Sequence, residues 1–212
     1  MKNPISVFQF LPATVLLLCA GCYSGTPDRV NPPDVDPGGA AKKAMDQYDT
    51  NNDGQLSAEE LVACPAILKD LEFFDANSDG NVSDDEIKAR IQSWHDSRTG
   101  IMSFSCTVNL GGNPLVGAVV KFVPESFLGD AVIVASGTTE VGGMAIISIA
   151  DEDAPENLKG IPGLTPGIYR VEITHPTTNI PAKYNTETTL GQEVSQDNPS
   201  LQTGVEFNLS AR

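Results

Sequence analysis

The sequence has little positive charge and few aromatic side chains. Lysine and arginine together number 13 against 28 aspartates and glutamates, so the 212 residues carry a net charge of −15 at neutral pH. Nucleic-acid binding depends on cationic side chains that neutralise phosphates, so we expect no nucleic-acid partner. Only 6% of the residues are aromatic, so any core is expected to consist mainly of valine, isoleucine, leucine and alanine.

The sequence also lacks common catalytic motifs. It contains no nucleophile-elbow serine, no Walker phosphate loop and no HExxH pair. Its two histidines, His95 and His175, fall at the end of an expected helix and before a proline. We expect both histidines to be structural, and the sequence predicts a protein that is not an enzyme.

Two twelve-residue segments, DTNNDGQLSAEE (49–60) and DANSDGNVSDDE (75–86), share one pattern of oxygen-bearing side chains. Each has an acid or amide at positions 1, 3 and 5, glycine at position 6, serine at position 9 and glutamate at position 12. Ca²⁺ takes six to eight oxygen ligands, and a loop that curls round the ion presents alternate side chains to it. The pattern predicts two Ca²⁺ ions. The predicted ligands are Asp49, Asn51, Asp53, Gln55 (through its backbone carbonyl) and Glu60 in the first loop, and Asp75, Asn77, Asp79, Asn81 (likewise) and Glu86 in the second.

Both segments fit D-x-[DN]-x-[DN]-G-x₅-E at every specified position and resemble the loops of the EF-hand family. The resemblance implies a small all-α pair of helix–loop–helix units, with the loops joined through Leu56 and Val82. Apolar residues one helical turn apart before the first loop, at 41–48, favour an entering helix. Serine at position 9 with glutamate at position 12 also predicts a capping box at the start of each exit helix. An acidic, solvated turn is the alternative interpretation.

The first residues, MKNPISVFQFLPATVLLLCAGC, have one lysine before an apolar run at 7–18 that is short for a membrane span. They resemble a bacterial lipoprotein signal that ends in Ala20-Gly21-Cys22. The resemblance implies a signal peptide at 1–21, lipid on Cys22, and a place in the bacterial cell envelope facing the periplasm or the exterior. Secretion with a free Cys22 and an uncleaved anchor are the alternatives. Residues 22–40, rich in proline, glycine and aspartate, predict a disordered tether.

Beyond residue 101 the apolar period changes from 3.6 to 2. Cys106, Val108 and Leu110 alternate with polar residues, and similar alternation recurs at 169–174 and 205–210. About seven short strands separated by turns predict an all-β sandwich, with a barrel as the alternative. The stretches GNPLVGAVVKFVP (112–124), PGIYRVEITHP (166–176) and IPAKYN (180–185) resemble carboxypeptidase-regulatory-like, or transthyretin-like, sandwich modules. That resemblance implies a non-catalytic module.

The predicted fold is therefore multidomain, with an all-α EF-hand pair at 41–97 followed by an all-β seven-stranded sandwich at 101–212. The predicted function is that of a calcium-binding, lipid-anchored envelope protein whose partners are the membrane and an unidentified protein. An accessory, docking component of an envelope complex is the main alternative. A calcium-dependent hydrolase or a carbohydrate-binding protein is less favoured. Cys64 and Cys106 are expected either to form a disulfide or to be buried thiols.

Overall fold

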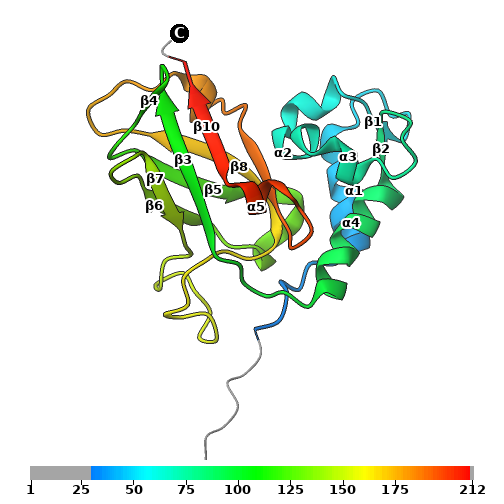
Figure 1. The fold of residues 1–212 in the computed structure, drawn as a ribbon. Coiled ribbons are helices and arrows are strands. Elements are labelled where there is room, and N and C mark those ends of the chain that lie inside the picture. Colours follow the sequence, from blue (N-terminus) through cyan, green and yellow to red (C-terminus); the bar gives the residue numbers. More distant parts are fainter. Residues whose placement is uncertain (1–29, 211–212) are drawn as a thin grey trace, which may run out of the picture.

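The computed structural model describes residues 30–210, apart from the side chains of residues 202 and 203. Cys22 and the segment that resembles a lipoprotein signal lie outside the described residues. The described chain forms a helical unit followed by a β-rich unit, and the two lie side by side (Figure 1). Among the helices of residues 30–210, none combines the length and the apolar character needed to cross a bilayer.

The helical unit contains two helix–loop–helix segments in sequence order. Its elements are α1 (Pro37–Tyr48), β1 (Gln55–Leu56), the 3₁₀ helix η1 (Glu60–Ala63), α2 (Pro65–Lys69), α3 (Leu71–Phe74), β2 (Val82–Ser83) and α4 (Asp84–Ser97). Strands β1 and β2 are antiparallel, with Leu56 opposite Val82. Both side chains are fully buried, which confirms the predicted pairing of the two loops.

Helix α1 begins at Pro37, within the segment 22–40 that the sequence predicted to be a tether. Proline favours the first turn of a helix because its fixed φ suits the helix and the N–H that it lacks would have no partner there. Ala40 and Val35 are buried as well. The predicted boundary at 41 is therefore wrong, since the folded unit already includes the residues from Val35 onward.

The β-rich unit contains two four-stranded sheets. Its elements are β3 (Phe104–Leu110), β4 (Asn113–Pro114), β5 (Val119–Pro124), the 3₁₀ helix η2 (Ser126–Ala131), β6 (Ala135–Thr138), β7 (Met144–Ile147), β8 (Gly167–Thr174), the 3₁₀ helix η3 (Ala182–Tyr184), β9 (Gly191–Val194), α5 (Ser200–Thr203) and β10 (Val205–Leu209). One sheet has the antiparallel order β6-β5-β8-β9. In the other, β3 pairs in parallel with β10 and antiparallel with β4 and β7.

Aromatic side chains join the two sheets. The ring of Phe122 on β5 lies 5.0 Å, centroid to centroid, from that of Phe104 on β3, and 6.4 Å from that of Phe207 on β10. Edge-to-face contacts of this kind add to the free energy gained from burying the rings. Cys106, on the same strand as Phe104, is buried, as is Cys64 of the helical unit, and both are free thiols. The two cysteines are therefore not joined by a disulfide.

The described residues of this unit contain eight strands, one more than the seven predicted. Two of them, β4 and β9, lie in segments without alternating apolar residues. The apolar run 131–135 begins at the last residue of η2 and joins the ladder only at Ala135. A run of buried residues does not by itself distinguish a strand from a packed loop.

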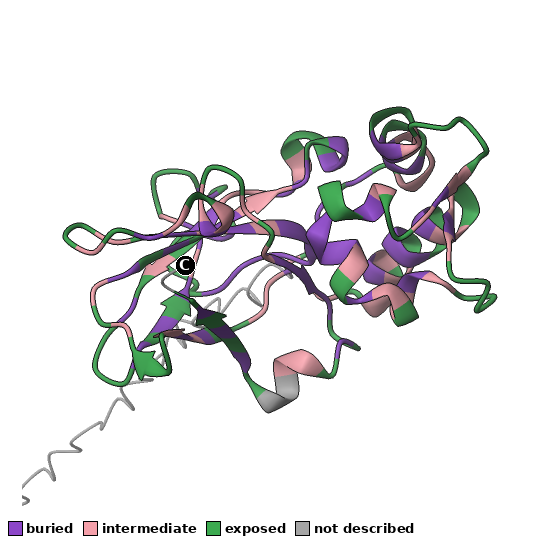
Figure 2. Cartoon of the chain, turned by 90° about the horizontal axis from the view of Figure 1, so that it is seen from above, coloured by how far each residue is buried: buried purple, intermediate pink, exposed green. Residues whose placement is uncertain are grey.

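The two units share a closely packed boundary. Figure 2 shows buried residues on the facing sides of both units, with exposed residues concentrated in the outer loops. Helix α2 packs against β9, and α1 packs against η2. Gly191 on β9 makes the contact with α2 possible, because a Cβ placed there would lie 2.1 Å from the backbone nitrogen of Ala66.

Candidate functional site

The two acidic loops lie at the end of the helical unit that faces away from the β-rich unit (Figure 1). Each loop has glycine at its sixth position with positive φ, 83° at Gly54 and 87° at Gly80. This left-handed conformation favours glycine, because a Cβ would be strained there. The β1–β2 pair then holds the two loops beside each other.

In the first loop, backbone N–H groups surround the side-chain oxygens of the predicted ligands. The carboxylate of Asp49 accepts hydrogen bonds from the backbone nitrogens of Asp53 (3.2 Å) and Gly54 (3.0 Å). The Oδ1 of Asn51 accepts from the nitrogen of Asp53 at 2.8 Å. The Oδ1 of Asp53 accepts from the nitrogen of Gln55 at 2.9 Å. These bonds wrap the backbone round positions 1, 3 and 5.

The second loop repeats this arrangement. The carboxylate of Asp75 accepts from the backbone nitrogens of Asp79 (3.0 Å) and Gly80 (2.8 Å). The Oδ1 of Asn77 accepts from the nitrogen of Asp79 at 2.8 Å, and the Oδ1 of Asp79 accepts from the nitrogen of Asn81 at 2.9 Å. The shared sequence pattern therefore produces the same local fold twice.

The terminal glutamate of each loop connects the loop's two ends. The Oε1 of Glu60 accepts from the backbone nitrogen of Thr50 (2.9 Å), while its Oε2 accepts from the nitrogen (3.0 Å) and hydroxyl (2.9 Å) of Ser57. These bonds, led by that of the Ser57 backbone, lower the pKa of Glu60 to about 2. Glu86 bonds in the same way to Ala76 and Ser83 and completes the predicted capping box of α4.

The donor set of each loop suits calcium, because every predicted ligand offers oxygen and two aspartates and a glutamate supply negative charge. The structure gathers the five predicted ligands of each site in one loop. Within residues 30–210, however, no three acidic, histidine or cysteine side chains converge into a ready-made cluster. Both terminal glutamates are instead bonded to the backbone and to serine.

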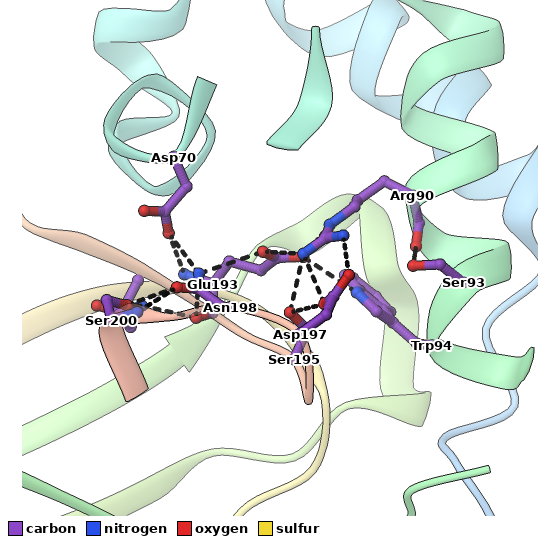
Figure 3. A network of polar contacts seen from close by, with 10 residues as sticks. Asp70, Arg90, Ser93, Trp94, Glu193, Ser195, Asp197, Asn198 and Ser200 are labelled. Carbon is purple, nitrogen blue, oxygen red and sulfur yellow. Dashed lines mark hydrogen bonds and ion pairs between the residues drawn. The ribbon is translucent and has the colours of Figure 1, made fainter. Parts of the chain in front are cut away.

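Behind the second loop, its exit helix binds a buried glutamate of the β-rich unit (Figure 3). Arg90, four residues after Glu86, donates from Nε and Nη2 to the two carboxylate oxygens of Glu193 at 2.6 and 2.8 Å. Its Nη1 donates to Asp197 at 2.8 Å. Trp94, one turn further along α4, donates from its indole nitrogen to Glu193 at 3.1 Å. Glu193 is 0% exposed, so its charge depends on these partners.

The helical segment before the second loop contacts the same place. Asp70 separates α2 from α3, and its buried carboxylate accepts from the side chain of Asn198 (3.1 Å) and from the backbone nitrogen of Glu193 (3.4 Å). The adjacent Lys69 donates to the side chain of Gln192 on β9. The helical segments before and after the second loop therefore both contact β9 and the turn that follows it.

The first loop has a corresponding contact with a different glutamate. Tyr48, the residue before Asp49, donates its hydroxyl to the Oε2 of Glu125 at 2.7 Å. Glu125 is 1% exposed, and burial raises the pKa of its carboxyl group. Burial, together with the nearby Glu125, also raises the pKa of the Cys64 thiol well above its usual value. Cys64 is therefore a neutral, packed side chain and not a reactive thiolate.

Replacing Glu125 by glutamine tests the effect of this burial on stability. A carboxyl whose folded pKa is raised binds its proton more tightly in the folded state, so it stabilises the fold less as the pH rises from the ordinary carboxyl pKa through the raised one. Glutamine has no such titration and keeps an oxygen for Tyr48. We expect the difference in unfolding free energy, E125Q minus the unaltered protein, to increase as the pH rises from the ordinary glutamate pKa of about 4.3 through the raised one.

Urea unfolding across this range measures the difference, with the exposed Glu187→Gln as the matched control. Parallel stability curves for E125Q and the unaltered protein would contradict the prediction.

Sequence reasoning missed this interface almost entirely. It assigned no role to Arg90, Glu193 or Glu125. Strand β9, Gly191–Val194, is buried at all four positions although it includes glutamine and glutamate. The pairing of one arginine with a glutamate 103 residues away has no local signal in the sequence.

Comparison with known proteins agrees with the assignment of the two loops. A family model described as EF hand matches residues 41–65 and 68–91. No curated protein and no solved structure matches the chain. The chain thus contains an EF-hand pair, which indicates calcium binding, followed by a β-rich unit with several sheets.

Proposed function

We propose that this is a non-catalytic, calcium-binding protein of the bacterial cell envelope, anchored by lipid on Cys22, in which two bound ions hold the helical unit in the shape that docks on the β-rich unit. The observation that carries the proposal is the connection of each loop to a buried glutamate. Tyr48 links the first loop to Glu125, and Arg90 links the second to Glu193.

Charge within the loops supports a structural role for the ions. Each loop has three predicted carboxylate ligands, two aspartates and a glutamate, within twelve residues. Like charges at such separations repel, and a divalent cation offsets the repulsion. A free calcium concentration a thousand times the Kd of one site would stabilise the folded state by about 4 kcal/mol. Tyr48 directly precedes the first loop, and Arg90 lies one helical turn after the second. A change in the conformation of either loop would therefore alter the contact with Glu125 or with Glu193.

In this proposal the β-rich unit is a transthyretin-like sandwich that acts as a spacer or binding module. The two facing sheets and their shared aromatic contacts support that fold. The first described residues pass close to the junction of the units, since a Cβ on Gly100 would lie 2.4 Å from the carbonyl oxygen of Val30. A lipid-anchored chain would therefore enter the folded protein beside the junction. A protein partner for the sandwich is part of the proposal.

A calcium titration followed by thermal unfolding and Trp94 fluorescence tests the proposal, with Glu60→Gln and Glu86→Gln as variants. We expect the unaltered protein to bind two calcium ions per chain. Each variant should bind one ion with unchanged affinity and lose about 10-fold or more in affinity at the altered loop, because a charged oxygen ligand is removed. Calcium should raise the unfolding temperature of both units together. Magnesium serves as the control ion.

Two matched variants separate ligand loss from loss of charge. Glu59→Gln and Asp85→Asn remove exposed acids at position 11 of each loop, next to the terminal glutamates. We expect both to bind two ions. Stabilisation of the helical unit alone would rule out coupling to the β-rich unit, and the absence of binding at millimolar calcium would rule out the whole proposal.

A further inference from the structure

A cleft of about 360 Å³ lies between the end of α4 and the turn after β9. It is separate from the calcium loops. Helix α4 contributes one side of it, the turn at 195–197 contributes the other, and Pro166 adds an apolar surface. The lining residues are Ser93, Trp94, Ser97, Pro166, Ser195, Gln196 and Asp197.

The side chains that line this cleft offer hydrogen-bond acceptors and almost no donors. The hydroxyl of Ser93 donates to the carbonyl of Arg90 (2.6 Å), and that of Ser97 donates to the carbonyl of Trp94 (2.7 Å). Ser195 donates to Asp197 at 2.8 Å. The indole N–H of Trp94 is bonded to a buried glutamate outside the cleft (Figure 3). A hydroxyl whose hydrogen is used in a donated bond can still accept through two lone pairs. Ser195 and Ser97 already accept one bond each, from Arg90 (2.9 Å) and from the backbone nitrogen of Thr99 (3.2 Å), so each keeps one lone pair for a ligand, and Ser93 keeps two.

Gln196 is the exception among these side chains. Its amide oxygen accepts from Thr99 at 2.9 Å, which leaves the amide N–H₂ at the edge of the cleft. One neutral amide is a weak attraction for an anion beside a carboxylate and three acceptor hydroxyls. The side chains that line the cleft therefore favour a ligand that donates hydrogen bonds.

The charge of the surroundings favours a cation. The single guanidinium of Arg90 is shared between two carboxylates, Glu193 and Asp197, so this group of three carries one excess negative charge when both acids are ionised. The side chain of Asp197 is 61% exposed, so a ligand can reach it. The cleft also borders the last turn of α4, where the helix dipole places partial negative charge.

We propose that this cleft binds an ammonium group carried on a short carbon chain. The ammonium would donate to Asp197 and the serine hydroxyls, and the carbon chain would lie against the apolar surface of Trp94 and Pro166. The ammonium could belong to a free amine or to a lysine side chain of a partner, since both have the same chemistry.

Calorimetric titration of the purified protein at constant calcium, with n-butylammonium as the probe, tests the proposal. Trp94 is the only tryptophan in the chain, so its fluorescence reports binding independently. Butanol and butyrate serve as neutral and anionic probes of the same length. We expect saturable binding of butylammonium, and binding of the other two at least about 10-fold weaker, because a charge-assisted hydrogen bond is lost.

Three variants locate the site. Asp197→Asn should weaken butylammonium binding by about 10-fold or more. Asp96→Asn, which removes an exposed charge of α4 outside the cleft, should not weaken it. Because Asp197 also bonds to Arg90, Ser97→Leu provides a second test that fills the cleft and leaves that ion pair intact. Ser97→Leu should abolish binding. Because it also removes the bonds of the hydroxyl to Trp94 and Thr99, thermal unfolding must show that the variant is folded at the temperature of the titration.

A further comparison distinguishes the two sources of the ammonium. N-acetyl-lysine-N-methylamide, which represents a lysine within a protein, should bind more tightly than butylammonium if the natural ligand is a partner, and less tightly if it is a free amine. The proposal is overturned by the absence of saturable binding at about 10 mM butylammonium, by equal binding of butanol, or by equal effects of D197N and D96N.

Discussion

Replacing Arg90 by methionine is expected to lower the free energy of unfolding by about 3–5 kcal/mol, because it leaves a buried carboxylate without its counter-charge. Arg90 is 8% exposed, and its partner Glu193 is 0% exposed. Asn198 and Trp94 still donate to Glu193 in the variant, but neither carries a positive charge. Urea unfolding monitored by Trp94 fluorescence gives the change directly.

Two controls show whether the effect comes from the ion pair. Lys88→Met removes an exposed positive charge from the same helix and should change stability by no more than about 0.5 kcal/mol. In the double variant R90M/E193M the uncompensated charge is gone, so we expect much of the lost stability to return, since apolar replacements of buried ion pairs are often neutral or stabilising. A double variant as unstable as R90M would show that arginine acts through packing, in which its guanidinium lies over Phe73 and Phe74.

Replacing Gly191 by alanine is expected to destabilise the protein by about 1–3 kcal/mol or more, because the added methyl group overpacks the boundary between the units. The new Cβ would lie 2.1 Å from the nitrogen and 2.5 Å from the Cα of Ala66. These are backbone atoms, so no rotamer change relieves the clash and α2 must move away from β9. The bond from Lys69 to Gln192, formed by the next residue on β9, should weaken with it.

Gly38→Ala is the matched control, because Gly38 lies in α1 and a Cβ there would lie 3.8 Å from the side chain of Asp36, an ordinary van der Waals contact. Alanine in a helix stabilises relative to glycine by roughly 0.5–1 kcal/mol, so the two variants should change stability in opposite directions. Since the φ of Gly191 is not positive, backbone strain does not contribute to the expected cost. Equal unfolding temperatures for G191A and the unaltered protein would contradict the close approach of α2 and β9.

The sequence by itself determined the two loops and those strands in which apolar and polar residues alternate. Each calcium ligand set lies within twelve consecutive residues, so its geometry depends on local backbone bonds such as those from Gly54 to Asp49. Strands with one buried face, such as β3, β8 and β10, also have a local period of two. Predictions for these parts depended on residues that are neighbours in the chain, and the structure places them accordingly.

Only the tertiary structure decided where the two units meet. Strand β9 lacks an apolar pattern, because the partners of its buried polar side chains come from α2 and α4, about a hundred residues earlier in the chain. Arg90 on an amphipathic helix has the pattern of a solvated charge until Glu193 faces it. A buried charge is tolerable only beside its counter-charge, and the sequence does not show which distant residues come together. The interface, the cleft beside it and the early start of α1 therefore depend on packing between elements and not on local pattern.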